Sequence, residues 1–501
     1  MQMILLSMSI QCLELLPVVF RLLFNYQSKI IMKLNSIKKL SVVLCLAACP
    51  ILYTSCNKML DLKPKDQVDG EDIFQSLSTV NRAVLGVYAS WVPEYTLRIG
   101  SVVADECAIG LKNAGVNGDA QHLYRWSFTS FDPEILNPWT NGYQVINQVN
   151  RILEGLPKVP ANSADEAAEK LKLESELLAI RAYEHFELYR LYASSYKSDA
   201  LAVPYVTNND VDAKPSRPTA AEFFSKLELD LNAALENSND DIDITRMNRI
   251  AMNALQARIA LYTGNWNDAV KYADKVIAAR PLATINEFAD IWKDKNNAEV
   301  VFKLKRTNQS TIRPGDIWKN AALGIVYFAP SQQLLDSYDQ DNDIRYDAYF
   351  DHDPSLEEEG QLPDVIAKYA GEEGAENRND IKIFRTSEMY LIRAEAYANL
   401  GSEQLAADQL NALRASRIED YEPVEFEGAA DLKAAIMEER LKELPFEGHR
   451  FFDLKRWGKS VVRKTITGQD VLSPADLYYY IPIPQAEVLS NPNIRPNNSS
   501  W

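Results

Sequence analysis

The stretch Ala257–Pro281 reads ARIALYTGNWNDAVKYADKVIAARP and has the pattern of two helices joined by a tight turn. Small side chains at Ala257 and Ala269 let two antiparallel helices approach closely, and Gly264 makes the turn between them. Trp266 is spaced to pack over that turn, and the closing proline ends the second helix. This is the spacing of a tetratricopeptide repeat, so we predict a helical hairpin here.

The same register recurs much further along the chain, where a set of small, aromatic and aliphatic residues has matching spacing: Ala394, Tyr397, Gly401, Ala406 and Leu410. The two repeats are separated by an inserted block, residues 282–380, which reads as loops with short strands at Val300–Leu304 and Ile325–Phe328. Large irregular insertions in helical solenoids commonly serve binding. We therefore predict a mainly α fold, a tetratricopeptide-like helical scaffold with a loop-rich inserted lobe.

Apolar residues at helical spacing predict further helices, at Ile73–Trp91, Pro138–Leu156, Ala164–Tyr192, Thr219–Leu235 and Asp431–Leu444. Thr219 and Glu222 form a capping-box pattern at the start of one of them. Pro93–Pro133 is rich in glycine and polar residues, so we expect a loop-rich stretch there. We divide the chain into a tether at 56–69, a helical region with binding loops at 70–281, the inserted lobe at 282–380 and a C-terminal helical region at 381–501.

The N-terminal part has the pattern of an export signal. Lys38-Lys39 precede the apolar run Leu40–Tyr53, and small residues follow. The run is shorter than the ~20 residues that a membrane-spanning helix needs. We expect residues 1–55 to be a signal peptide, with translation starting at Met32 and residues 1–31 untranslated. A cysteine at the cleavage site indicates a lipoprotein, and the local pattern leaves both Cys49 and Cys56 open as the lipidated residue.

Composition argues against several classes of function. The net charge of −17 is opposite to that of a nucleic-acid-binding protein, which needs basic patches. The four histidines show no metal-ligand spacing, and neither a phosphate-binding glycine loop nor a serine nucleophile motif is present. Acidic neighbours such as Glu438-Glu439 do not face one another on a helix. We expect no catalytic residue, no metal and no cofactor.

Four motifs then occur in a characteristic order. Glu439–Arg456, ERLKELPFEGHRFFDLKR, resembles the ER-x-x-EL-x-FEG-x-R-x-x-DL-x-R motif of the SusD/RagB family. Glu388–Tyr397 resembles the family's E-x-YL-x-RAEA helix, and Ile481–Pro484 with Asn491–Asn493 resembles its closing IP-IP and NP-N signature. Cys56 followed by Leu60–Pro64, LDLKP, resembles the family's start after the signal. The resemblance covers Cys56–Trp501.

The resemblance implies an outer-membrane nutrient-binding lipoprotein of Bacteroidetes, lipid-anchored at the cell surface. Its implied partner is a SusC-like TonB-dependent transporter, which receives an oligosaccharide or, in some members, a peptide. Because Leu60-Asp61 follow Cys56 at the family's usual short distance, the resemblance favours Cys56 over Cys49. A tetratricopeptide scaffold for outer-membrane assembly is the alternative from another class.

Sugar binding needs aromatic faces for pyranose rings and polar side chains for hydroxyl groups. Tryptophans at element ends or in loops, with two nearby polar residues, are therefore the candidate ligand-binding residues: Trp91, Tyr95, Arg98, Trp126, Trp292 and Trp318. Trp91, Tyr95 and Arg98 form the first choice of patch. Trp139, Trp266 and Trp457 are expected in the core. We expect Arg440 and Asp453 to form structural charge pairs.

Overall fold

The computed structural model describes residues 72–115, 118–210, 212–238, 243–310, 312–465, 468–498 and 501. All of them belong to one compact unit, which follows Asp69. The predicted signal peptide, the predicted tether and both candidate lipidation cysteines lie outside the described residues. None of the helices in these ranges combines the length and apolar character needed to cross a bilayer.

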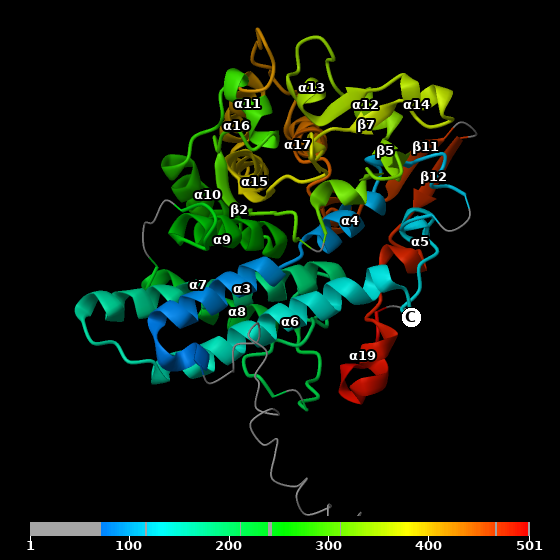
Figure 1. Ribbon diagram of the computed structural model, residues 1–501. Coiled ribbons are helices and arrows are strands. Elements are labelled where there is room, and N and C mark those ends of the chain that lie inside the picture. Colours follow the sequence, from blue (N-terminus) through cyan, green and yellow to red (C-terminus); the bar gives the residue numbers. More distant parts are fainter. Residues whose placement is uncertain are drawn as a thin grey trace, which may run out of the picture. The chain divides into compact units, whose positions relative to one another are not determined.

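The predicted helical hairpin is confirmed. Helix α9 (Arg249–Thr263) ends at Gly264, whose φ of +70° is left-handed, and α10 (Trp266–Ala279) follows. The second hairpin consists of α15 (Thr386–Asn399) and α16 (Glu403–Ala415), with Gly401 at a φ of +77°. Helix α10 packs against α15, so the hairpins are neighbours in space although the inserted block separates them in sequence (Figure 1).

The remaining long helices extend this stack on both sides, which confirms the mainly α fold: α3 (Leu77–Ser90), α6 (Pro133–Gly155), α7 (Ala164–Tyr192), α8 (Ala220–Glu236) and α17 (Ala429–Glu443). α7 packs against α6 and α8, and α17 packs against α15 and α16. The capping box at the start of α8 is present. Other, shorter helical segments are η2 (Asp72–Gln75), η3 (Leu156–Lys158), α11 (Ile285–Trp292), η4 (Pro314–Ile317), α12 (Gln332–Leu335), α13 (Arg345–Tyr349), α14 (Ser355–Glu358), α18 (Arg450–Arg456), η5 (Leu477–Tyr479), α19 (Gln485–Ser490) and η6 (Pro492–Ile494).

The stretch Pro93–Pro133, which we expect to be rich in loops, also contains two helices, α4 (Glu94–Val102) and α5 (Gln121–Tyr124). α4 carries Gly100, one of the glycines on which that expectation rested. A Cβ atom on Gly100 would lie 2.6 Å from the backbone oxygen of Gly448. This glycine therefore permits a close helix-to-backbone contact and does not mark a turn.

The strands pair only in twos among the described residues, and every pair is antiparallel. The predicted strand β2 (Val300–Leu304) pairs with β10 (Ile381–Arg385), so this ladder closes the base of the inserted block. The other predicted strand, Ile325–Phe328, is divided at Tyr327 into β4 (Ile325–Val326) and the start of β5 (Phe328–Pro330). The remaining pairs are β1 (Cys107–Ile109) with β5 (Phe328–Pro330), β3 (Lys319–Asn320) with β4 (Ile325–Val326), β6 (Phe350–His352) with β7 (Asp364–Ile366), β8 (Gly371–Glu372) with β9 (Ala375–Glu376), and β11 (Val461–Thr465) with β12 (Gly468–Leu472).

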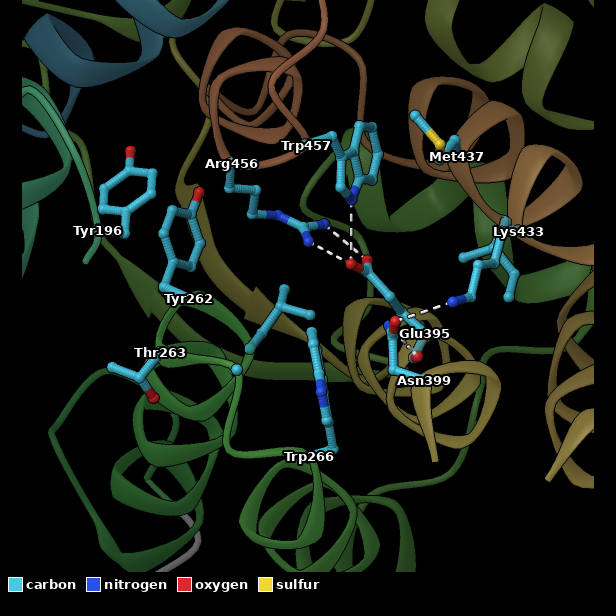
Figure 2. A pocket seen from close by; sticks show the side chains of 13 residues that line it. Tyr196, Tyr262, Thr263, Trp266, Glu395, Asn399, Lys433, Met437, Arg456 and Trp457 are labelled. Carbon is cyan, nitrogen blue, oxygen red and sulfur yellow. Dashed lines mark hydrogen bonds and ion pairs between the residues drawn. The ribbon is translucent and has the colours of Figure 1, made fainter. Parts of the chain in front are cut away.

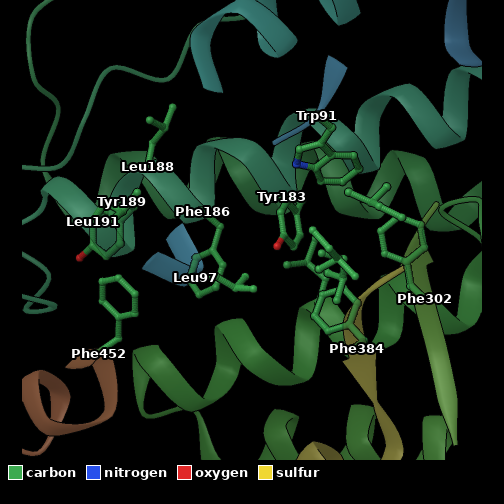
Figure 3. Packing of buried hydrophobic residues seen from close by; sticks show 14 of the residues in the cluster. Trp91, Leu97, Tyr183, Phe186, Leu188, Tyr189, Leu191, Phe302, Phe384 and Phe452 are labelled. Carbon is green, nitrogen blue, oxygen red and sulfur yellow. The ribbon is translucent and has the colours of Figure 1, made fainter. Parts of the chain in front are cut away.

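The hydrophobic core joins the helices to this ladder. Trp91 packs edge-on against Tyr183 of α7, with ring centroids 4.9 Å apart, and 5.9 Å from Phe302 of β2. Phe384 of β10 approaches the same tyrosine at 6.0 Å (Figure 3). The base of the insertion is thus part of the helical core, which fixes the position of the loops that follow it.

Charged residues of the Glu439–Arg456 motif are buried and paired. The Arg440 Nε atom donates to Asp453 at 2.8 Å. Glu443 accepts hydrogen bonds from Arg345, Arg385 and Arg417 at 2.9–3.1 Å. The structural interpretation of this motif is confirmed, because these pairs tie α17 to α18 and to the inserted block.

Candidate ligand-binding site

The two loop-rich stretches of the sequence meet in one lobe. β1, which follows α4, pairs with β5 of the inserted block, with Cys107 opposite Pro330. The carbonyl oxygen of Tyr327 accepts hydrogen bonds from the Gly110 backbone and from the Asn113 side chain, both at 2.9 Å. Residues more than 200 positions apart in the chain are thereby held in one surface.

Helix α4 presents two of the predicted residues on its partly exposed side. Tyr95 and Arg98 are one turn apart, so they lie on the same face. Arg98 Nη2 is 3.3 Å from a carboxylate oxygen of Asp119, which joins α4 to the loop before α5. Burial raises the pKa of the Tyr95 phenol, so at neutral pH this group is protonated and can donate a hydrogen bond.

A cavity of about 230 Å³ lies in the inserted block beside η4, which contacts α4. Its lining is partly apolar and partly charged: Gly315, Trp318, Lys319, Ala321, Val326, Phe328, Asp351, Val365, Ile366, Ala367, Tyr369, Ala370, Glu376 and Asn377. Trp318 Nε1 and the Tyr369 hydroxyl are buried and lack a hydrogen-bond partner among the described residues. An indole N–H is always a donor, and burial raises the pKa of Tyr369 well above its usual value, so its hydroxyl stays protonated and is a donor too. Unpaired buried donors are costly, and these two belong to residues that line the cavity.

The turn that carries Trp318 is held by contacts that the sequence did not reveal. Asn377 donates to Asp316 at 2.9 Å and to the backbone oxygen of Lys319 at 2.7 Å. A Cβ atom on Gly315 would lie 2.3 Å from the Tyr369 carbonyl oxygen. Sequence reasoning missed Asn377 and Tyr369 because no local pattern distinguishes them; they become neighbours of Trp318 only when the insertion folds back on itself.

Trp91 and Trp292 do not contribute to this surface. Trp91 is 1% exposed within the core, and Trp292 is 3% exposed beneath the Lys368 ammonium, which lies 4.1 Å from its ring centroid. A ring enclosed in this way has no free face for a sugar, so the choice of these two residues as stacking platforms is corrected. Trp318, at 2% exposure, likewise cannot offer a whole ring face.

Trp126 lies between these extremes. Its Nε1 atom donates to the Val103 carbonyl oxygen at 3.0 Å, next to the end of α4. The Arg463 guanidinium lies 4.3 Å from the centroid of its ring. The indole is half-buried and already stacked by a cation, which leaves only part of it for a ligand.

The lobe therefore combines a tyrosine and an arginine on α4 with a cavity that carries two unpaired donors. Such an arrangement suits a neutral polar ligand with several hydroxyl groups. Within the described ranges, no three His, Cys, Asp or Glu side chains gather as a metal site.

Two family models match the chain. Residues 305–501 match the model of the SusD family, and residues 58–261 match a SusD-like model described as starch-binding associating with outer membrane. A SusD-like protein of Formosa agariphila is 20% identical over 85% of this chain and 93% of its own length.

Solved structures show the same similarity. A SusD superfamily protein from Bacteroides thetaiotaomicron is 25% identical, with a TM-score of 0.74 over 85% of this chain and 100% of its own. A SusD superfamily protein from Bacteroides vulgatus is 22% identical, with a TM-score of 0.75 over the same shares.

Proposed function

Because this chain belongs to the SusD family, we propose that it captures an oligosaccharide at the cell surface and passes it to a SusC-like TonB-dependent transporter. The matching of residues 58–261 to a starch-binding, outer-membrane-associating model supports this role in carbohydrate acquisition. Lipid attachment at Cys56 would keep the binding unit beside its transporter.

The proposed binding surface is the lobe formed by the two loop-rich stretches, and the observation that carries it is the pairing of β1 with β5. The contact between α4, which carries Tyr95 and Arg98, and η4, which lies beside the cavity, supports a site that includes both. Sugar C–H groups would pack on the Tyr95 ring. Ring hydroxyls would accept hydrogen bonds from Arg98, Trp318 Nε1 and the Tyr369 hydroxyl.

In this mechanism the protein binds and releases without making or breaking covalent bonds. Affinity comes from ring stacking and from several hydrogen bonds of moderate strength, which permits release to a partner. No catalytic residue, metal or cofactor is part of the proposal. Asp351 and Glu376 would act as hydrogen-bond acceptors for hydroxyl groups.

A glycan array with the full-length protein would first identify an oligosaccharide ligand. We expect Tyr95→Ala and Arg98→Gln each to raise the Kd for it about tenfold, since each removes about 1.4 kcal/mol of contact. Trp318→Phe keeps an aromatic ring but removes the Nε1 donor together with part of the indole, and we expect a smaller increase, about threefold to tenfold. Isothermal titration calorimetry measures all three.

Tyr272→Ala is the matched control, because this tyrosine is a partly exposed residue of α10, outside the lobe. Its Kd should equal that of the wild type. If all three lobe variants bind with the Kd of the wild type, the proposed site is wrong. If the protein binds no glycan on the array but binds peptides, the peptide alternative replaces the oligosaccharide proposal.

A further inference from the structure

A second pocket, of about 390 Å³, lies in the helical scaffold away from the lobe. It opens between the α9–α10 turn, α15, α17 and the end of α18, and its lining is rich in aromatic residues: Tyr196, Leu261, Tyr262, Thr263, Gly264, Trp266, Glu395, Asn399, Lys433, Ile436, Met437, Arg456 and Trp457. Its volume is within the range of about 300–1,000 Å³ that is typical of ligand sites.

Two of its walls are tryptophans that the sequence predicts to lie in the core. Trp266 and Trp457 are both only half-buried, so that prediction is corrected for them. Figure 2 shows them on opposite sides of the opening, with Tyr196 and Tyr262 to one side and Lys433 to the other. Indole faces at the mouth of a pocket are suited to flat or ring-shaped groups.

The back of the pocket is a rigid charged pair. Arg456 Nη2 donates to Glu395 Oε2 at 2.7 Å, and Arg456 Nε donates to Asp453 at 2.8 Å. Glu395 Oε1 accepts from Trp457 Nε1 at 3.0 Å, which fixes the orientation of that indole. Because Arg440 also pairs with Asp453, the two arginines balance the two carboxylates, and the cluster contributes no net charge to the pocket.

Lys433 supplies the remaining charge. Its ammonium donates to Asn399 Oδ1 at 3.0 Å and forms no ion pair with any described carboxylate. An ammonium has three donors, so two stay available. The chain has a net charge of −17, so its overall field does not attract anions. The Lys433 ammonium, which has no carboxylate partner among the described residues, would attract an anionic group locally to this pocket.

We propose that this pocket is a second carbohydrate subsite, which takes a sugar ring bearing a carboxylate. The ring lies against Trp266 and against the part of Trp457 that the Arg456 guanidinium, 4.5 Å from its ring centroid, leaves uncovered, and the carboxylate accepts hydrogen bonds from Lys433. A purely apolar ligand would strip water from Lys433 and Asn399 without replacing their hydrogen bonds, which disfavours it. The proposal rests on the proposed carbohydrate-binding function but concerns different residues from those of the lobe.

The test uses full-length protein and trisaccharides of galacturonate, mannuronate and glucuronate, each beside the neutral trisaccharide of the corresponding hexose. We expect at least one acidic trisaccharide to bind more tightly than its neutral counterpart. Lys433→Gln should raise the Kd for the acidic sugar about tenfold and change that for the neutral sugar less than twofold. Trp266→Leu should weaken both about tenfold.

Lys226→Gln is the matched control, since Lys226 is an exposed lysine on α8 that does not line the pocket. Circular dichroism and thermal unfolding show whether Trp266→Leu keeps its fold. Lys433→Gln tests the same pocket from α17, without a change in the α9–α10 hairpin. Equal affinity for acidic and neutral sugars, or an unchanged Kd in Lys433→Gln, overturns the subsite. If the affinity for oligosaccharides depends on Tyr95 and Arg98 but not on Lys433, only the subsite proposal fails. If no oligosaccharide binds the wild type, the proposed function fails as well.

Discussion

Glu443 is the residue on which the charged network depends most. It is fully buried and accepts hydrogen bonds from three arginines that are also enclosed, Arg345, Arg385 and Arg417. Although burial raises the pKa of a carboxyl group, the three guanidinium groups hold the pKa of Glu443 well below its usual range. It therefore stays charged through the neutral and mildly acidic range, and its removal leaves buried cations without a partner.

We predict that Glu443→Gln destabilises the protein by about 3–5 kcal/mol, the usual cost of breaking a buried ion pair from one side. The matched control is Glu438→Gln, an exposed carboxylate on the same helix, which should change stability by less than about 0.5 kcal/mol. Urea unfolding followed by circular dichroism measures both. Equal midpoints for the two variants would contradict the structural role of the motif.

Tryptophans illustrate how little a single residue's local sequence says about its exposure. Trp91 follows a helix and lies two residues before Pro93, as a loop residue would, yet it lies in the core. Trp266 and Trp457 lie within regular motifs, yet they line a pocket. Exposure depends on which distant elements cover a ring, and that information is absent from the neighbouring sequence.

At the scale of elements, two contacts determine the architecture: the β2–β10 pairing and the packing of α10 on α15. The β2–β10 ladder returns the chain to the point where the insertion left the scaffold, and α10 then packs directly against α15. The helical repeat can therefore continue across the insertion as if it were uninterrupted. Each repeat stabilises its neighbour by burying an apolar face that it cannot bury alone.

We predict opposite effects for two glycine-to-alanine substitutions. Gly264 has a φ of +70° at the α9–α10 turn, so Gly264→Ala should cost about 1 kcal/mol. Gly86 lies within α3, and a Cβ atom added there would meet no heavy atom within 4 Å, so Gly86→Ala should stabilise the protein by about 0.5–1 kcal/mol. Thermal unfolding measures both; shifts of the same sign would contradict the assignment of the turn.

At the scale of the whole molecule, the proposed function requires the binding unit to stay at the membrane. The residue that would carry the lipid, Cys56, lies outside the described residues, and its assignment remains a prediction from the family motif. We predict that Cys56→Ser abolishes lipid attachment, while Cys49→Ser leaves it intact, because only Cys56 has Leu60-Asp61 at the expected distance. Mass spectrometry of the mature N-terminal peptide distinguishes the two, and a lipid on Cys49 would refute the assignment.

The amino-acid sequence was sufficient for the helical hairpins, the capping box, the strand at the base of the insertion and the family, because each depends on residues close together in the chain. The tertiary structure alone decided that the two loop-rich stretches join through β1 and β5, and that helix α4 contacts η4, beside the Trp318 cavity. It also decided that Trp91 is enclosed while Trp266 is not. The physical reason is that helix and turn formation are governed by local spacing, whereas burial and the gathering of polar groups are set by packing between distant segments.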